Sequence, residues 1–232
     1  MIQPIYLDYN GTTPHDPEVI AAMRPFLETE FGNPSSSHWY GIKPKQAVEA
    51  ARRQVAGLLG CRPQELFFTS GGTEANNHAI KGMARALKHK GRHIVTSSFE
   101  HPAILEVCRA LASEGFETTC VAVDGQGMLD PLEVERAIRP DTILITVMHA
   151  NNETGVIFPI ERLSRLTKET DPGIIFHTDA TQSVGKIHID LEDNFKHVDL
   201  LSFSGHKLHA PKGVGALFHR RGHRAHRGAT DA

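Results

Sequence analysis

Residues 174–182 read Ile-Ile-Phe-His-Thr-Asp-Ala-Thr-Gln, and residues 200–207 read Leu-Leu-Ser-Phe-Ser-Gly-His-Lys. Each stretch begins with an apolar run of strand length and ends in polar residues, as buried strands of a parallel sheet do. Ligands of such sheets bind beyond the carboxyl ends of the strands. The two stretches therefore predict a ligand site that contains Asp179, Gln182 and Lys207.

A lysine and an aspartate at two such strand ends meet the chemical needs of pyridoxal 5'-phosphate. The Lys207 amine can bond covalently to the cofactor aldehyde, and the Asp179 carboxylate can keep the pyridine nitrogen protonated, so that the ring accepts electrons. A carboxylate at the mouth of a buried strand is costly unless it is paired, and a pyridinium N–H would pair with it. The alternative interpretation of Asp179 is an N-cap for the next segment. Gln182 can donate a hydrogen bond to the cofactor's phenolic oxygen.

Two glycine-containing turns are candidates for holding the cofactor phosphate. Residues 70–74, Ser-Gly-Gly-Thr-Glu, follow a predicted strand and open a predicted helix, so backbone N–H groups near Gly72 and the Thr73 hydroxyl can meet a phosphate. Ser204 and His206 come just before the lysine and can reach the same phosphate. Each turn also has a plainer interpretation, a capped glycine turn in the first case and a polar loop in the second.

His101 and Asn152 complete the candidate site from two further loops. A histidine at a strand-to-helix turn can stack on the cofactor ring and move protons, since imidazoles titrate near neutral pH. A helix cap or a surface residue is the alternative for His101. Residues 151–155, Asn-Asn-Glu-Thr-Gly, have turn-forming composition, and one of their amides can contact the cofactor or the substrate.

Apolar β-branched runs alternate with amphipathic stretches along the rest of the chain. This alternation predicts parallel βαβ units and an α/β fold, with a mostly parallel sheet and helices on both faces. The predicted helices cover residues 16–28, 41–59, 73–88, 102–114, 131–138 and 159–170. The predicted strands cover residues 66–69, 93–96, 118–123, 142–148, 174–178, 200–203 and 215–218, and we expect the strand at 66–69 to be buried.

The composition gives no reason to expect nucleic acid or a membrane as a partner. Hydrophobic residues make up 40% of the 232 positions, charged residues 22%, and the net charge is −2. The chain contains no apolar run of membrane-spanning length, so we expect a cytoplasmic protein. The odd number of cysteines and the absence of a CxxC pair indicate neither disulfides nor a zinc site, and the cysteines are Cys61, Cys108 and Cys120.

The last residues, 219–232, differ from the rest of the chain. They have no apolar periodicity and an excess of basic charge, so we expect disorder. His219, His223 and His226 have spacings that would suit a metal only if this segment were helical, and we predict no metal site.

Seven motifs, in this order, resemble the amino-terminal part of the cysteine desulfurases, a class-V aminotransferase-like group related to selenocysteine lyase. They are Tyr6-Leu-Asp-Tyr-Asn-Gly-Thr-Thr-Pro14, Gly32-Asn-Pro-Ser-Ser36, Phe68-Thr-Ser-Gly-Gly-Thr-Glu74, Glu100-His101, Asn151-Asn-Glu-Thr-Gly155, Asp179-Ala-Thr-Gln-Ser-Val-Gly-Lys186 and Ser202-Phe-Ser-Gly-His-Lys207. The resemblance runs from about residue 5 to about residue 222. It implies the large domain of a type-I pyridoxal-phosphate enzyme over residues 16–218, after an amino-terminal segment of residues 1–15 and before the tail.

The resemblance also implies a role for each candidate residue. Lys207 would hold the cofactor and act as a general base at the substrate α-carbon, while His101 would stack on the ring and assist proton transfer. Asp179 would pair with the pyridine nitrogen and Gln182 with the phenolic oxygen. The remaining residues would contact the phosphate or, in one case, the ring oxygen and the substrate carboxylate; they are Gly72, Thr73, Ser204, His206 and Asn152.

The reaction implied is removal of sulfur from L-cysteine, which leaves L-alanine and an enzyme-bound persulfide. Enzymes of this kind are homodimers that pass sulfur to an acceptor or scaffold protein, for example in iron–sulfur cluster assembly. They continue far beyond 232 residues, so we expect the small carboxy-terminal domain, the loop with the catalytic cysteine and the substrate-carboxylate arginine to be missing here. None of the three cysteines falls at the position of the family's nucleophile.

Two alternatives stay open from the sequence. One is a selenocysteine lyase or another class-V enzyme, because substrate choice would depend on the missing part. The other is a non-catalytic remnant that binds the cofactor weakly or does not fold. We predict little or no desulfurase turnover by the 232-residue chain alone.

Overall fold

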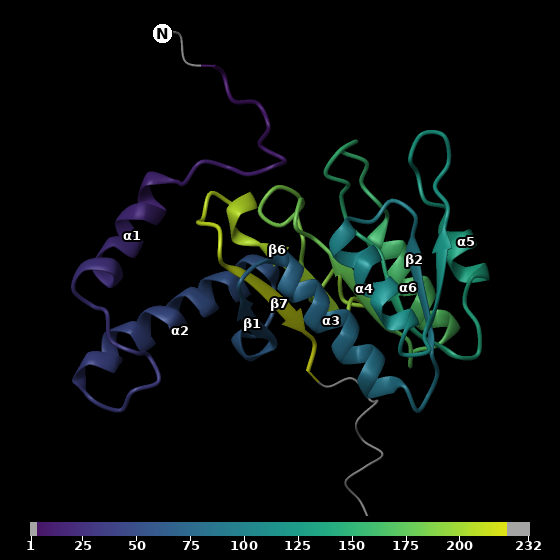
Figure 1. Ribbon diagram of the computed structural model, residues 1–232, viewed down its shortest axis with the longest axis horizontal. Helices are drawn as coiled ribbons and strands as arrows, with labels where there is room; N and C mark the ends of the chain where they lie inside the picture. Colours follow the sequence, from purple (N-terminus) through teal and green to yellow (C-terminus); the bar gives the residue numbers. More distant parts are fainter. Residues whose placement is uncertain (1–3, 222–232) are drawn as a thin grey trace, which may run out of the picture.

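Residues 4–221 are described by a computed structural model of the protein, in which seven strands form one sheet (Figure 1). The strands are β1 (Leu66–Thr69), β2 (His93–Ser97), β3 (Glu117–Val121), β4 (Thr142–Thr146), β5 (Ile175–Asp179), β6 (Leu200–Ser204) and β7 (Gly215–His219). They lie in the order β1-β7-β6-β5-β4-β2-β3. Strands β2 to β6 are parallel, and β7 runs antiparallel to both β6 and β1. The predicted mostly parallel sheet is confirmed.

The helices lie where the amphipathic stretches predict them. They are α1 (Pro17–Glu28), α2 (Trp39–Leu59), α3 (Gly72–Leu87), α4 (Pro102–Ala112), α5 (Pro131–Arg136) and α6 (Ile160–Thr170), with short 3-10 turns at Pro63–Glu65 and Gly205–Lys207. Several ends differ from the prediction. Helix α4 stops two residues early, at Ala112, because the chain turns back at Gly115, whose φ of 84° lies in the left-handed region.

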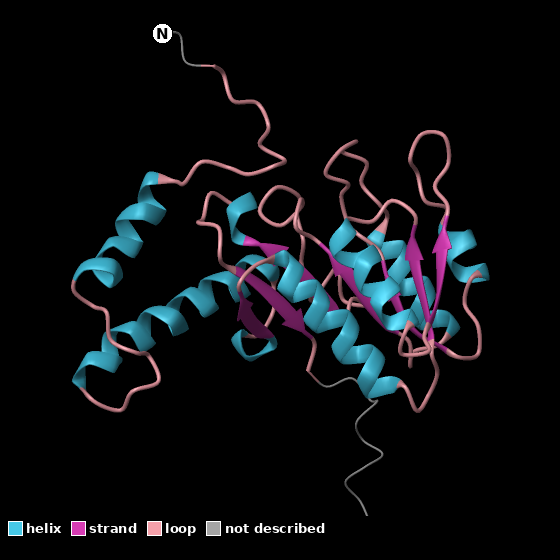
Figure 2. Cartoon of the chain, viewed as in Figure 1, coloured by secondary structure: helices cyan, strands magenta, loops and turns pink. Residues whose placement is uncertain are grey.

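Apolar layers cover both faces of the sheet, as predicted. Successive residues of a strand point to opposite faces, so each central strand contributes to both layers. One layer contains α3 and α4 together with Ile94, Leu144 and Ile175. The other contains residues of α2, α5 and α6 together with Val95, Ile145 and Phe176. The loops that follow the parallel strands gather at one edge of this sandwich, which is the upper edge in Figure 2.

Strand β1 differs from the prediction of a buried strand. It lies at the sheet edge and pairs with β7, so one of its sides has no neighbouring strand among the described residues. Leu66 is buried, but Phe67 and Phe68 are 40% and 38% exposed. The guanidinium of Arg52 covers the Phe68 ring at 4.9 Å from its centroid, which gives the exposed aromatic ring a cation–π contact.

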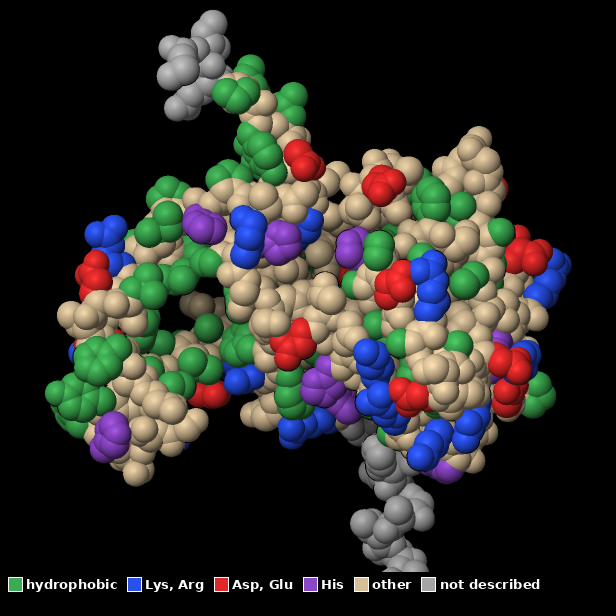
Figure 3. Space-filling view, viewed as in Figure 1, with side chains coloured by type: hydrophobic (Ala, Val, Ile, Leu, Met, Phe, Trp, Pro, Cys, Tyr) green, Lys and Arg blue, Asp and Glu red, His purple; other side chains and the backbone are tan. Residues whose placement is uncertain are grey.

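Helix α1 and most of α2 form an arm that extends away from the sheet, whereas the carboxy-terminal end of α2 packs against the core through Ala56 and Leu59 (Figure 1). Asp16 caps α1 by accepting from the Glu18 N–H at 2.7 Å, but α1 contains no buried residue. Apolar side chains gather on this arm (Figure 3), and the exposed ones are Ile20, Phe26, Leu27, Phe31, Trp39, Tyr40, Ile42, Val48 and Leu58. No helix within residues 4–221 has the length and apolar character needed to cross a membrane.

The start of the predicted disordered tail has a defined structure. Strand β7 ends at His219, and the Arg220 guanidinium donates to the carbonyls of Val198, Leu191 and Phe195. The other two histidines of the tail, His223 and His226, lie outside the described residues.

Candidate cofactor site

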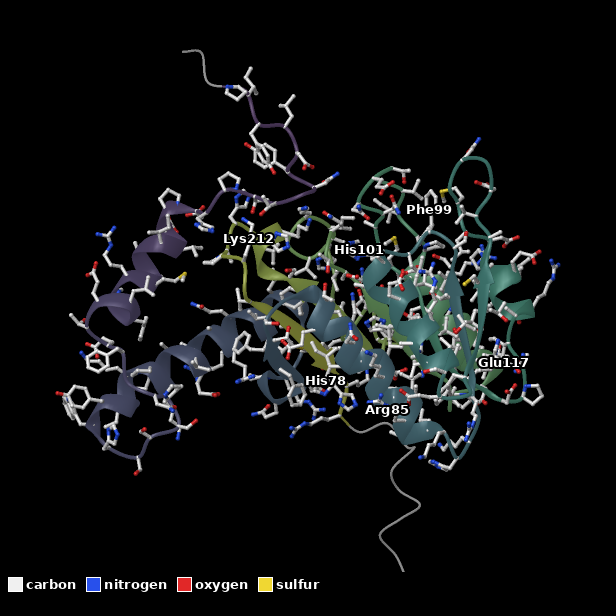
Figure 4. The ribbon with its side chains drawn as sticks, in the orientation of Figure 1. His78, Arg85, Phe99, His101, Glu117 and Lys212 are labelled. Carbon is white, nitrogen blue, oxygen red and sulfur yellow. The ribbon has the colours of Figure 1, made fainter. Side chains whose placement is uncertain are left out.

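A cavity of about 280 Å³ lies beyond the carboxyl ends of the parallel strands. The loops and helix starts that form it include the loop of His101, which Figure 4 places at the same edge as Lys212, whereas Arg85 and Glu117 lie toward the opposite edge. The cavity brings together, from five segments of the chain, all nine residues singled out from the sequence: Gly72, Thr73, His101, Asn152, Asp179, Gln182, Ser204, His206 and Lys207.

Asp179 is the last residue of β5, and its carboxylate is held by two donors. Its side chain is almost fully buried, with 6% exposed. Oδ2 accepts from Asn76 Nδ2 at 2.7 Å, and Oδ1 accepts from the Thr181 N–H at 2.9 Å. The second bond is the local capping contact that the alternative interpretation expects. Because a carboxylate can accept about four hydrogen bonds, Asp179 keeps acceptor capacity for a ligand in the cavity.

The Lys207 amine lies on the 3-10 turn that follows β6. It donates to the carbonyl oxygens of Asn10 and Gly11, the latter at 2.7 Å. Burial lowers the pKa of Lys207, and the neighbouring Lys186 ammonium lowers it further. A lowered pKa increases the fraction of neutral amine, which is the form that attacks an aldehyde.

The start of α3 forms the opposite end of the cavity. The N-cap residue, Gly71, supplies no side-chain cap, so the first N–H groups of the helix have no partner within it. The Glu74 carboxylate accepts from the Ser70 N–H at 2.6 Å, and hydrogen bonding from the Ser70 hydroxyl and N–H lowers the pKa of Glu74. A Cβ on Gly72 would lie 2.9 Å from the Thr181 hydroxyl. The glycine therefore leaves a cradle that a side chain would fill.

Ser204 and His206 lie beside this cradle. Ser204 is buried, and the His206 ring contacts the Thr12 hydroxyl at 3.1 Å. Burial lowers the pKa of His206, and the positive charges of Lys207 and Lys212 lower it further. His206 is therefore a neutral hydrogen-bonding group at neutral pH, close to two cationic side chains.

His101 combines both interpretations open to it from the sequence. It is the N-cap of α4, where its Nδ1 accepts from the Ala103 N–H at 3.0 Å, and it also lines the cavity. An Nδ1 that accepts a hydrogen bond carries no proton, so the neutral ring holds its proton on Nε2. The cap thus fixes which nitrogen can donate.

The segment before α1 closes the cavity from one side, and reasoning from single residues did not identify it. Gly11 is part of the lining. The Asn10 carbonyl accepts from Gln182 Nε2 at 3.0 Å, and Asn10 Nδ2 donates to the Asn152 carbonyl at 3.2 Å. The available signal was the Tyr6–Pro14 motif of the family resemblance, because composition and periodicity say little about such a segment.

Asn76 is the second site residue that sequence reasoning missed. It lines the cavity and is 1% exposed. The signal was its place three residues after Thr73, within the stripe of buried positions on α3 formed by Gly72, Ala75, Ala79 and Ile80. A polar side chain among apolar core positions of a helix indicates a specific partner.

Two buried titratable groups lie near the site. Burial raises the pKa of Glu100 to about 8, although its carboxyl accepts from Ser97 Oγ at 2.5 Å and from the Met148 N–H at 3.0 Å. Burial lowers the pKa of His177 to about 4. The two His177 nitrogens contact the hydroxyls of Thr146 at 2.7 Å and Ser202 at 2.9 Å, so the ring is neutral and its hydrogen bonds are satisfied.

All three cysteines belong to the described part of the chain, and none of them lines the cavity. Burial raises the pKa of Cys61 and of Cys108 to about 12. Such thiols carry almost no thiolate at neutral pH. Within residues 4–221, no group of three histidine, cysteine or acidic side chains is placed to hold a metal ion.

The residues present fit pyridoxal phosphate. A lysine amine with a lowered pKa, a buried carboxylate with spare acceptor capacity, and an open helix N-terminus beside a glycine cradle all face one cavity. These are respectively groups that can bond the aldehyde, hold a ring N–H and receive a phosphate.

The sequence profile of the class-V aminotransferases matches residues 5–227. The chain is 52% identical over 226 residues to the cysteine desulfurase IscS of Dictyoglomus turgidum, covering 97% of this chain and 56% of the relative. It is 53% identical over 221 residues to IscS of Pectobacterium carotovorum, covering 94% and 54%. The chain therefore spans about half the length of the curated relatives it matches.

Solved structures agree with the sequence relatives. A NifS-like protein superposes with a TM-score of 0.91 at 40% identity, covering 95% of this chain and 60% of that protein. A protein described as SspA in complex with cysteine superposes with a TM-score of 0.89 at 43% identity, covering 93% and 61%. These similarities agree with the α/β fold described above.

Proposed function

The chain belongs to the aminotransferase class-V family, and we propose that it carries the cofactor-binding region of a cysteine desulfurase that acts on L-cysteine. Family members of this kind depend on pyridoxal phosphate. Two further findings support the proposal: the curated relatives at about 52% identity are cysteine desulfurases, and one solved relative is a complex with cysteine.

The single observation that carries the proposal is the shared cavity. Nine residues, chosen from the sequence for one cofactor's chemistry, line the same cavity although they span positions 72 to 207. Many α/β proteins place polar loops at this edge of the sheet. The cavity here combines a lysine amine, a buried carboxylate held by two donors, and a helix start whose first N–H groups have no partner within the helix. This combination fits far fewer ligands than polar loops alone would.

When bound, pyridoxal phosphate supplies an electron sink for negative charge that develops at the substrate α-carbon. The residues of the chain would do the rest. The Lys207 amine would hold the cofactor and would serve as the base for the α-proton, a task that its lowered pKa favours. Asp179 would hold the ring N–H, and the open start of α3 would bind the phosphate. His101 can donate from Nε2, because its Nδ1 is occupied by the Ala103 N–H.

Transfer of the sulfur requires a thiol that none of the three cysteines here supplies, since none lines the cavity. We propose that this thiol, the substrate-carboxylate arginine and a second subunit belong to the complete enzyme, which acts as a cytoplasmic homodimer. A sulfur-acceptor protein, as in iron–sulfur cluster assembly, would receive the product sulfur. The names of the IscS relatives are consistent with that pathway.

Covalent trapping tests the cofactor assignment directly. The purified chain is incubated with pyridoxal phosphate, reduced with borohydride and digested, and the modified lysine is located by mass spectrometry. We expect one pyridoxyl group, on Lys207, and none there in a Lys207→Arg variant. Lys212 is a useful internal control, because it lies in the loop before β7 and does not line the cavity.

The labelling and activity results distinguish the cofactor site, the cysteine desulfurase and the selenocysteine lyase assignments. Labelling scattered over surface lysines would refute the cofactor site. A single Lys207 adduct with alanine formation from cysteine would support the desulfurase, and faster release of selenide from selenocysteine would favour a selenocysteine lyase. Sulfide release by the 232-residue chain at enzyme-like rates would refute the expectation that the chain alone has little turnover.

A further inference from the structure

The Asn76 side chain donates to the proposed partner of the cofactor ring nitrogen. It projects from the second turn of α3, and its Nδ2 lies 2.7 Å from Asp179 Oδ2. Asn76 and Asp179 are separated by 103 positions in the sequence and are 1% and 6% exposed. The bond therefore links a helix to the end of a strand inside the protein, at the wall of the cavity.

This contact comes at an energetic cost to the fold. The other amide atom, Asn76 Oδ1, is buried and has no hydrogen-bond partner within residues 4–221. A buried polar atom without a partner destabilises a protein by an amount comparable to one lost hydrogen bond. The neighbouring buried positions of α3 hold glycine, alanine or isoleucine. An apolar residue at position 76 would suit this surface and leave no oxygen unpaired, so the amide has to be explained by what it donates to.

Asp179 needs such a donor. Within residues 4–221, no lysine, arginine or histidine forms an ion pair with it. The closest histidine along its strand, His177, uses both ring nitrogens on hydroxyl groups. The carboxylate is held instead by the Asn76 amide and the Thr181 N–H, one on each oxygen. Two donors on different oxygens fix both the position and the rotation of the carboxylate plane.

We infer that Asn76 is a positioning residue, which holds the Asp179 carboxylate in the orientation that receives the pyridine N–H of the cofactor. This inference rests on the proposed function and adds to it a residue that acts through Asp179. Its amide also keeps one Asp179 lone pair occupied, so the carboxylate offers its remaining acceptor capacity to the cavity. With the amide removed, Asp179 is held by the Thr181 N–H alone and its carboxylate loses its fixed rotation.

The test compares two Asn76 variants with a matched control. Asn76→Ala removes the donor, and Asn76→Asp keeps the shape but replaces the donor with a carboxylate. Asn77→Ala is the control, because Asn77 is the adjacent residue of the same type and its amide bonds the Thr73 carbonyl within the helix. Three properties are measured for each protein: the dissociation constant for pyridoxal phosphate, the pH dependence of the bound cofactor's long-wavelength absorbance, and cooperative thermal unfolding.

We expect both Asn76 variants to unfold cooperatively, to bind pyridoxal phosphate about ten- to a hundredfold more weakly, and to shift the pH dependence of the absorbance. The larger effect is expected for Asn76→Asp. The Asn77→Ala protein should match the wild type in binding and absorbance. A purely structural role for Asn76 would change the unfolding temperature and leave the absorbance profile of the bound cofactor unmoved.

Three results would overturn the inference. Binding and absorbance equal to those of Asn77→Ala would show that the amide does not matter to the cofactor. Failure of both Asn76 variants to fold would assign the residue to the stability of the fold. Absence of a Lys207 adduct in the wild type would overturn the proposed function together with this inference, whereas an adduct in the wild type with unaltered Asn76 variants overturns the inference alone.

Discussion

Replacing Glu100 with glutamine should remove a large pH dependence from the stability of the protein. Glu100 is buried, and its carboxyl accepts from Ser97 Oγ and from the Met148 N–H. Burial raises its pKa from the ordinary 4.5 to about 8. The folded state therefore holds a proton between about pH 4.5 and pH 8 that the unfolded state has already released.

The difference between the folded-state and unfolded-state pKa of Glu100 sets the sign and the size of its effect on stability. The stabilisation is fully present below the unfolded-state pKa of 4.5 and is lost as the pH rises to about 8, above which stability no longer changes on account of this group. At about 1.4 kcal/mol for each tenfold change in proton affinity, the loss across this window is at most about 5 kcal/mol. Glutamine does not titrate, so the Glu100→Gln variant should not show this loss of stability with rising pH.

Urea unfolding followed by circular dichroism, from about pH 5 to about pH 9, measures the difference between the two proteins. Taking the difference is necessary because His177, whose pKa burial lowers to about 4, adds an opposite pH dependence to both proteins. As the pH rises, we expect the free energy of unfolding of the variant to increase by several kcal/mol relative to that of the wild type. A constant difference across this range would refute the reasoning.

An exposed glutamate serves as a control, because it shows whether the pH effect requires burial or follows from any glutamate charge. Glu114 is exposed, and its pKa is lowered by the hydrogen bond from Arg85. The Glu114→Gln variant should therefore lose stability relative to the wild type only as the pH rises to about 4.5, which is the opposite sign, and its difference from the wild type should stay constant between about pH 5 and about pH 9. Equal behaviour of the two glutamine variants would mean that the burial of Glu100 is not the cause.

Other predictions concern the core, the lysine and a helix cap. Lys168→Met should lower the free energy of unfolding in urea by about 3–5 kcal/mol, because it breaks the ion pair that the buried Lys168 ammonium forms with the Asp199 carboxylate at 2.6 Å; adding Asp199→Asn should recover part of this loss, and full additivity would contradict the account. Lys186→Gln should raise the pKa of Lys207, since Lys186 lowers it, so the pH dependence of borohydride-trapped adduct should move to higher pH; an unchanged profile would contradict this. Asp16→Ala should destabilise α1 by about 1 kcal/mol by removing its cap, seen as faster amide exchange within Pro17–Glu28 and not in α3.

The sequence was sufficient to predict the elements and much of the candidate site. Period-two and period-3.6 patterns depend on neighbouring residues, and parallel strands must present their carboxyl ends together. Knowing that Asp179 and Lys207 follow such strands was therefore enough to predict that they share an edge. Chemistry then indicated the cofactor, because few ligands need both an amine and a buried carboxylate.

What the sequence did not predict depends on long-range geometry. The contact between Asn76 and Asp179 joins residues 103 positions apart, and no local pattern encodes it. The crossing of the cavity by residues 10–13 and the edge position of β1 have the same origin. Phe67 and Phe68 read as core residues because apolar side chains on an edge strand and on a central strand look alike in sequence.

The position of β7 has a consequence for how the chain is made. Strand β1 is the first strand within residues 4–221, yet β7, the last strand of that range, is its partner in the sheet. A growing chain must therefore leave β1, with the Gly71-Gly72 turn that follows it, without its strand partner until Gly215–His219 has emerged from the ribosome. Closing so long a loop costs little at equilibrium, because each doubling of loop length adds only about 0.6 kcal/mol, but it delays folding. The end of the cavity that we propose binds the phosphate should thus be the last part of the sheet to assemble, and cofactor binding would test whether that assembly is complete.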